Sequence, residues 1–164
     1  LGRRELLERI RKNPLNRALR IDKMTLAALE ATLVKYLRPA EALADIRVLR
    51  ALTEPVTEVR RRAKRLAAAL RRDHSEGLDV RIVNGVSMAG GGSLPMREIA
   101  TVLVALQAHS LSAADLEGRL RRLETPVIVR VADDQVLMDV RTLDPDEISM
   151  IRGSLKAVLA KPEA

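Results

Sequence analysis

The spacing of hydrophobic residues changes near residue 77, and this change constrains the fold of the chain more than any other feature. Before residue 73, apolar residues recur at intervals of three and four, which is typical of amphipathic helices. After Gly77, the stretch DVRIVNGV at 79–86 alternates between apolar and polar residues, as a half-buried strand does. The sequence therefore predicts a series of helices followed by an α/β domain.

The first helices can be placed from their start and stop signals. Residues 3–12 have helical spacing, and Asn13 with the proline that follows it ends the pattern. Asp22 is positioned to cap a helix over 23–37. The apolar surface of that helix is so broad that we expect it to be mostly buried.

Two further helical segments precede the change of period. Pro39 is expected in the first turn of an amphipathic segment that extends to about residue 52. Thr53 is expected to cap the next helix, over 54–73. The face of that helix opposite its apolar stripe is rich in arginine.

The second half of the sequence predicts alternating strands and helices. After the strand at 79–86 we expect a strand at 99–106, a helix capped by Ser112, a hairpin over 126–143 that turns at Asp133 and Asp134, and a closing helix over 144–160. The predicted fold class is α/β. It is a small β-β-α-β-β-α sandwich whose helices cover one face of a mostly antiparallel or mixed sheet.

Positive charge is concentrated in the first part of the chain. The net charge is +7, with 19 Lys and Arg against 8 Asp and Glu in residues 1–72 and 10 against 14 in residues 73–164. The basic part is the candidate for meeting a polyanion, although the same charges would also suit a solvated helix face. Because Tyr36 is the only aromatic residue, any contact with nucleic acid should be made through the backbone rather than by base stacking.

Several other chemistries have no support in the sequence. There is no cysteine, and His74 and His109 lack the flanking ligands of a metal site, so we predict no metal. We interpret Asp133 and Asp134 as turn formers rather than an acid and base pair. No apolar run approaches the roughly 18 to 20 residues that cross a bilayer, and we predict a cytoplasmic protein with no membrane contact.

The loop SMAGGGSLP at 87–95 could in principle cradle a phosphate. It lacks the GKS or GKT ending of a P-loop, so we interpret its glycines as permitting special backbone shapes and assign it no role. The chain also opens without Met inside a helical pattern. We therefore expect it to be a piece of a longer polypeptide.

The fragment NPLNRALR at 13–20 places Arg17 and Arg20 three positions apart beside a proline turn. Paired guanidiniums can clamp an anion, because they stay charged and match phosphate geometry. Such pairs are also common on solvated helix surfaces. The residues alone leave both interpretations open.

Four stretches together resemble a known family: NPLNRALRIDKMTLAALEATL, VLRALTEPVTEVRRRAKRLA, GGGSLP and PVIVRVADDQVLMDVRTLDPDE. They are similar to the C-terminal portion of bacterial selenocysteine synthases, the L-seryl-tRNA(Sec) selenium transferases, over essentially the whole chain. The resemblance implies the aspartate-aminotransferase-like fold (fold type I) of enzymes that use pyridoxal 5'-phosphate. It also implies the conversion of L-seryl-tRNA(Sec) to L-selenocysteinyl-tRNA(Sec) with selenophosphate.

The resemblance assigns roles to parts of the chain. Residues 1–37 would complete the large cofactor domain and its connecting helix, and residues 38–164 would form the small domain. Arg17 and Arg20 would bind selenophosphate or a similar anion. The lysine that attaches the cofactor would lie upstream of Leu1, so the chain alone should be inactive.

The resemblance also implies partners. The full-length form would be a homo-oligomer built from dimers. The basic helix over 54–73 would approach either tRNA or a neighbouring subunit, a choice that the sequence leaves open. Two alternatives remain: another fold type I enzyme acting on a free amino acid, or a non-catalytic basic module for RNA binding or assembly.

Overall fold

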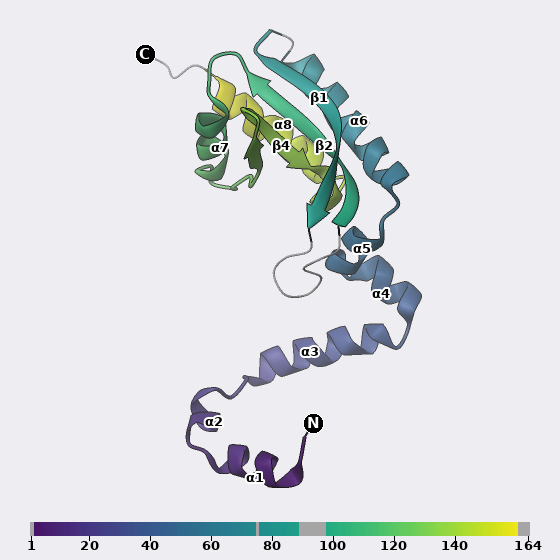
Figure 1. Cartoon of the computed structure of the whole chain (residues 1–164), viewed down its shortest axis with the longest axis vertical. Helices are drawn as coiled ribbons and strands as arrows, with labels where there is room; N and C mark the ends of the chain where they lie inside the picture. The colour runs from purple at the N-terminus through teal and green to yellow at the C-terminus, as the bar shows by residue number, and fades with distance from the viewer. Residues whose placement is uncertain (1, 75, 89–97, 161–164) are drawn as a thin grey trace. The chain divides into compact units, whose positions relative to one another are not determined.

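The computed structural model describes residues 2–74, 76–88 and 98–160 (Figure 1). The chain divides into two compact units, residues 1–49 and residues 50–164. The division follows Leu49, which is later than the boundary after residue 37 that the resemblance implies. The assignment of residues 1–37 to a larger cofactor domain stays a prediction.

The N-terminal unit is built from helices joined by tight turns. They are α1 (Arg4–Lys12), α2 (Leu15–Ala18), α3 (Lys23–Tyr36) and α4 (Pro39–Asp45), and α5 (Arg47–Thr53) begins in this unit. The expected end at Asn13, the cap at Asp22 and the first-turn position of Pro39 are confirmed. The segment expected as one helix after Pro39 is two, because the backbone at Ile46 is extended.

The expected burial of the helix over 23–37 is wrong for this chain. No residue of α3 is buried, and Met24 and Leu33 are 84% and 55% exposed. Among the described residues of the N-terminal unit, only Ala42 is part of a buried core. An apolar stripe predicts which face of a helix could be buried, but burial also needs a second layer opposite that face.

The C-terminal unit has α/β architecture, with strands and helices in the predicted β-β-α-β-β-α order after a first helix. Its elements are α6 (Val56–Asp73), β1 (Leu78–Met88), β2 (Glu98–Ala108), α7 (Ala113–Arg121), β3 (Arg130–Ala132), β4 (Gln135–Asp139), a 3-10 turn (Val140–Thr142) and α8 (Glu147–Leu159). The sheet order is β1-β2-β4-β3, and every pairing is antiparallel.

The core lies between the sheet and helices α6, α7 and α8 (Figure 1). Strands β1 and β2 pair from Leu78 opposite Ala108 to Met88 opposite Glu98, which puts the even-numbered residues of both strands on the same face. The core is entirely aliphatic apart from one methionine. Its members include Val59, Leu66, Leu70, Val80, Val102, Val104, Leu106, Leu116, Leu120, Val136, Met138, Ile151 and Leu155.

Local signals in the C-terminal unit are confirmed with one exception. Asp133 and Asp134 have φ of 50° and 55°, the left-handed pair that a two-residue type I′ hairpin turn requires. Ser112 caps α7 by accepting a hydrogen bond from the Asp115 amide at 3.1 Å. The expected cap at Thr53 is wrong, because Thr53 ends α5 and α6 begins after Pro55.

No helix among the described residues is both long enough and apolar enough to span a membrane. The loop GGGSLP lies outside the described residues.

Candidate anion-binding site

Arg17 and Arg20 lie on a tight turn between two helices of the N-terminal unit. After α1 ends, the Asn13 side chain accepts a hydrogen bond from the Leu15 amide at 3.0 Å, and the Arg17 amide donates to the Pro14 carbonyl at 3.1 Å. These bonds fold residues 13–18 into the single turn of α2. The two arginines thus sit on a locally ordered segment, one in α2 and one just beyond it.

Both guanidiniums are exposed, and within the described chain neither makes a hydrogen bond or an ion pair. Some cations of the same unit have partners, since Arg38 lies 3.1 Å from Glu41 and Lys35 pairs with Asp45, while others on α1, such as Lys12, have none among the described residues. An unpaired pair of permanent cations is available to an external anion. This turn is therefore the candidate site.

The nearest carboxylate in sequence, Asp22, is engaged in capping α3. It accepts hydrogen bonds from the Met24 and Thr25 amides at 2.8 and 2.9 Å and from the Thr25 hydroxyl at 2.6 Å. The Thr25 hydroxyl is the largest cause of a lowered pKa at Asp22. Both oxygens of Asp22 are thus bonded at the start of α3, and among the described residues Asp22 makes no ion pair with Arg17 or Arg20.

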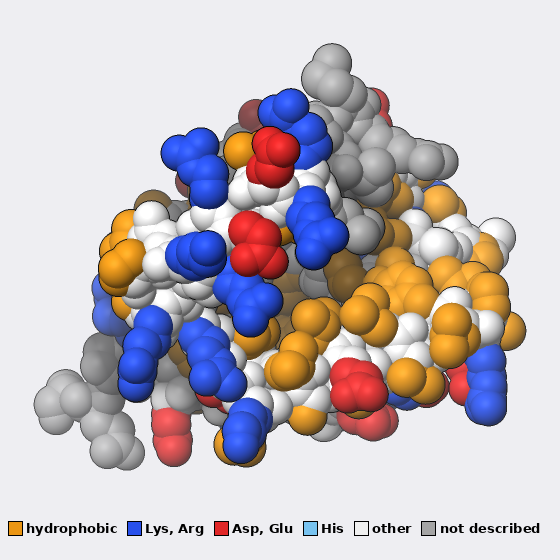
Figure 2. Space-filling view, turned by 90° about the horizontal axis from the view of Figure 1, so that it is seen from below, with side chains coloured by type: hydrophobic (Ala, Val, Ile, Leu, Met, Phe, Trp, Pro, Cys, Tyr) orange, Lys and Arg blue, Asp and Glu red, His pale blue; other side chains and the backbone are white. Residues whose placement is uncertain are grey.

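Figure 2 shows how charged and apolar side chains are distributed on one face. Lys and Arg side chains gather over one part of it, and hydrophobic side chains gather over another. The exposed apolar residues of α3 line a shallow groove of about 440 Å³, formed by Leu26, Leu29, Glu30, Leu33, Val34 and Leu37.

Three other candidate residues, His109, Asp133 and Asp134, have structural explanations. His109 lies with Nδ1 3.1 Å from the Glu76 carbonyl oxygen and Nε2 3.5 Å from Asp79. The hairpin turn accounts for Asp133 and Asp134. Within the described chain, no group of three or more His, Cys, Asp or Glu could hold a metal ion.

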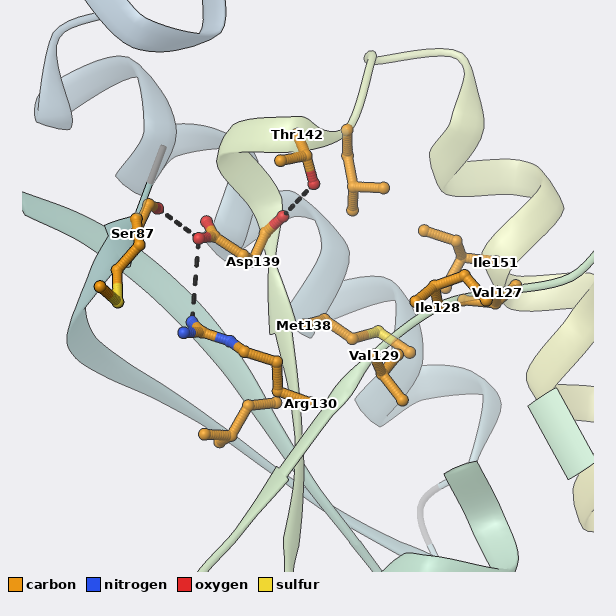
Figure 3. Close-up of a pocket in the computed structure, with 12 residues that line it drawn as sticks. Ser87, Val127, Ile128, Val129, Arg130, Met138, Asp139, Thr142 and Ile151 are labelled. Carbon is orange, nitrogen blue, oxygen red and sulfur yellow. Dashed lines mark hydrogen bonds and ion pairs between the residues drawn. The ribbon is translucent and has the colours of Figure 1, made fainter. Parts of the chain in front are cut away.

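A polar network in the C-terminal unit was not predicted. Asp139, at the end of β4, accepts a hydrogen bond from the Ser87 hydroxyl (Figure 3). It accepts a second from the Thr101 hydroxyl at 2.8 Å. Arg130 Nη2 lies 3.9 Å from the same carboxylate. The network borders a cavity of about 410 Å³ whose other walls are apolar apart from Thr142. With both oxygens of Asp139 engaged, its evident role is to join β1, β2 and β4.

Arg141 is a second feature that the sequence did not reveal. It is 5% exposed, and its guanidinium donates to three carbonyls, those of Ala51 (2.9 Å), Glu54 (2.8 Å) and Ala100 (2.6 Å). Beside it Arg62 pairs with Glu54 and donates to the Val140 carbonyl. These two arginines fasten the connection between α5 and α6 to the sheet.

Comparison with known proteins identifies the class of protein to which the chain belongs. The family model of L-seryl-tRNA selenium transferase matches residues 1–144. The chain belongs to this family.

Curated relatives agree. The chain is 46% identical over 159 residues to the L-seryl-tRNA(Sec) selenium transferase of Nitratidesulfovibrio vulgaris, covering 97% of this chain and 34% of that protein. It is 44% identical to the protein of that name from Desulfomicrobium baculatum (98% and 35% covered) and 39% identical to the one from Aquifex aeolicus (98% and 34% covered). The chain thus spans about a third of the length of these relatives.

Proposed function

We propose that this chain is the C-terminal part of a transferase that converts L-seryl-tRNA(Sec) to L-selenocysteinyl-tRNA(Sec) with selenophosphate as the selenium donor. The observation that carries the proposal is the family match over residues 1–144, together with relatives of that name aligned over almost the whole chain. The names of these relatives support aminoacylated tRNA as the substrate, and the proposal includes a cytoplasmic homo-oligomer.

Within that reaction, Arg17 and Arg20 bind the anionic selenium donor. Two exposed guanidiniums without protein partners in the described chain support this role. A phosphate-like group accepts several charge-assisted hydrogen bonds from paired guanidiniums, and both guanidiniums keep their positive charge at physiological pH. Such contacts would hold the donor beside the carbon that it attacks, which is where positioned cations accelerate a reaction most.

The cofactor would be pyridoxal 5'-phosphate, which supplies an electron sink for departure of the seryl hydroxyl. Its attachment requires a desolvated lysine. Among the described residues, Lys12, Lys23, Lys64 and Lys156 are exposed, and Lys35 is half-buried and paired with Asp45. We propose that the attachment lysine lies in another part of the protein and that this chain contributes the anion-binding arginines.

Replacing Arg17 or Arg20 by glutamine in the full-length protein tests the proposal. We expect selenium transfer at limiting selenophosphate to fall by about a hundredfold in each variant, the loss typical of removing a positioned donor. Cofactor loading, measured by absorbance, and seryl-tRNA binding should change little. Arg11→Gln, on the neighbouring helix α1, is the matched control and should transfer selenium normally. Normal turnover at limiting selenophosphate in both test variants would rule out the role.

A further inference from the structure

Helix α6 has an unusually uneven charge distribution. Residues 56–72 contain seven Lys and Arg and one acidic residue, Glu58. One side of the helix is fixed, because Val59, Leu66 and Leu70 are completely buried in the core. The opposite side is therefore held outward by packing.

The seven cations divide into two sets. Three are used within the C-terminal unit: Arg60 donates to Asn84, Arg62 pairs with Glu54, and Arg71 donates to the Val80 carbonyl. The others are exposed at spacings that place them on one helical face, which we call the outer face of α6: Arg61, Lys64, Arg65 and Arg72.

Acidic residues do little to neutralise the outer face. Glu58 pairs with Arg61 at one end, and Asp73 lies 3.9 Å from Arg72 at the other end. Asp73 makes much shorter contacts with Arg152 of α8, including one of 3.0 Å. In the middle of the face, Lys64 and Arg65 make no hydrogen bond or ion pair with any described residue.

We propose that the outer face of α6 binds the phosphate backbone of RNA, namely the tRNA substrate. The eleven helical steps from Arg61 to Arg72 rise by roughly 16 Å, enough to follow several phosphates of a duplex. Clustered cations without aromatic residues suit backbone contact and not base recognition. This inference rests on the proposed function for the identity of the RNA.

A neighbouring subunit fits this face less well. A protein partner would have to present a matching acidic surface, and a second copy of this chain is the partner that a homo-oligomer supplies. Among the acidic side chains of the C-terminal unit, Asp139, Asp144 and Glu117 are bonded to other residues of the same unit, which leaves fewer of them for a partner copy. RNA needs no such complement beyond its phosphates.

The test is a double variant, Lys64→Gln with Arg65→Gln, in the full-length protein. Glutamine keeps the helix propensity and removes two charges. Binding is measured by fluorescence anisotropy with transcribed tRNA(Sec) and with an unrelated RNA hairpin, between roughly 50 and 200 mM salt. We expect about tenfold weaker binding of both RNAs at low salt and a log-log salt slope smaller by about two.

The matched control is Arg122→Gln with Lys156→Gln, which removes two exposed charges near α7 and on α8. The RNA affinity of this control should stay within about twofold of the wild type, because the two replaced residues are not on the outer face of α6 and would not contact the phosphates that set the salt dependence. Wild-type affinity and slope in the α6 variant would overturn the proposal. So would a loss of oligomeric mass with unchanged RNA affinity, because that result would make α6 a subunit interface.

The two proposals can fail separately. If the α6 variant transfers selenium with an unchanged kcat but a raised KM for tRNA, both stand. If the wild-type protein binds RNA with an α6-dependent salt slope but transfers no selenium, the RNA surface stands and the proposed function does not.

Discussion

Helices α3 and α6 both carry apolar residues at helical spacing, broadly around α3 and as a stripe along α6, but their environments are opposite. In α6, Leu66 and Leu70 are completely buried beneath the sheet, whereas in α3, Leu33 and Leu29 are 55% and 47% exposed. The difference lies in what each helix has opposite it. Helix α6 packs on β1 and β2, while the described part of the N-terminal unit offers α3 no second layer.

This contrast shows what a stripe of hydrophobic residues does and does not predict. The stripe fixes which face is apolar, and its burial depends on another surface being present. The C-terminal unit carries both surfaces within its own sequence. Consequently its stability should be sensitive to mutation, while that of the N-terminal unit should be far less so.

The largest expected difference is between Leu70→Ala and Leu33→Ala. Leu70→Ala should cost about 3 kcal/mol of unfolding free energy, because it leaves a cavity in a closed core. Leu33→Ala, the matched change on α3, should cost less than about 1 kcal/mol. Urea unfolding of the 164-residue chain measures both. Equal losses would mean that the apolar face of α3 is covered in solution.

Ion pairs should show the same contrast with smaller effects. The side chains of Arg62 and Glu54 are each only 14% exposed, so Arg62→Met leaves a carboxylate poorly solvated and should cost about 2 kcal/mol. Lys35→Met breaks a pair that is about half exposed and should cost less than about 0.5 kcal/mol. Comparable costs in urea unfolding would contradict this difference.

The smallest expected effect concerns acid stability. A hydrogen bond from Arg152 is the main cause of a lowered pKa at Asp73, in a pair that joins α6 to α8. A lowered folded-state pKa stabilises the fold above the usual pKa of 3.8, and this contribution is lost as the pH falls through the folded value. Asp73→Asn should therefore be less stable at neutral pH and lose less of its melting temperature on acidification.

Thermal unfolding at neutral pH and at about pH 3 measures this change. Asp22, whose pKa is also lowered, acts within α3 alone. The control Asp22→Asn should therefore leave the acid sensitivity of the C-terminal unit unchanged. An Asp73→Asn variant with the acid sensitivity of the wild type would show that the pair to Arg152 does not contribute.

Features encoded locally were predictable. The alternation at 79–86 gave β1, adjacent aspartates gave the hairpin turn, and Asp22 and Ser112 gave their helix caps. Each depends on residues within a few positions of one another. The order of strands and helices followed from these signals.

Features that depend on distant residues were not predictable. Asp139 is bonded to Ser87 and Thr101, which lie 52 and 38 positions away. Arg141 follows a strand without any pattern that marks it as buried. The arginine pair at 17 and 20 could be located but not assigned a role from its residues, because an exposed cation looks the same with or without a ligand.

The buried guanidinium of Arg141 also limits which amino acids can replace it at this position. This one side chain donates hydrogen bonds to three backbone carbonyls, which belong to two segments that lie about 90 and 41 positions away in the sequence. Lysine would keep the charge but present a compact ammonium instead of a planar fork, and glutamine is too short to replace that fork. An apparently conservative exchange here would leave peptide carbonyls of both segments unsatisfied.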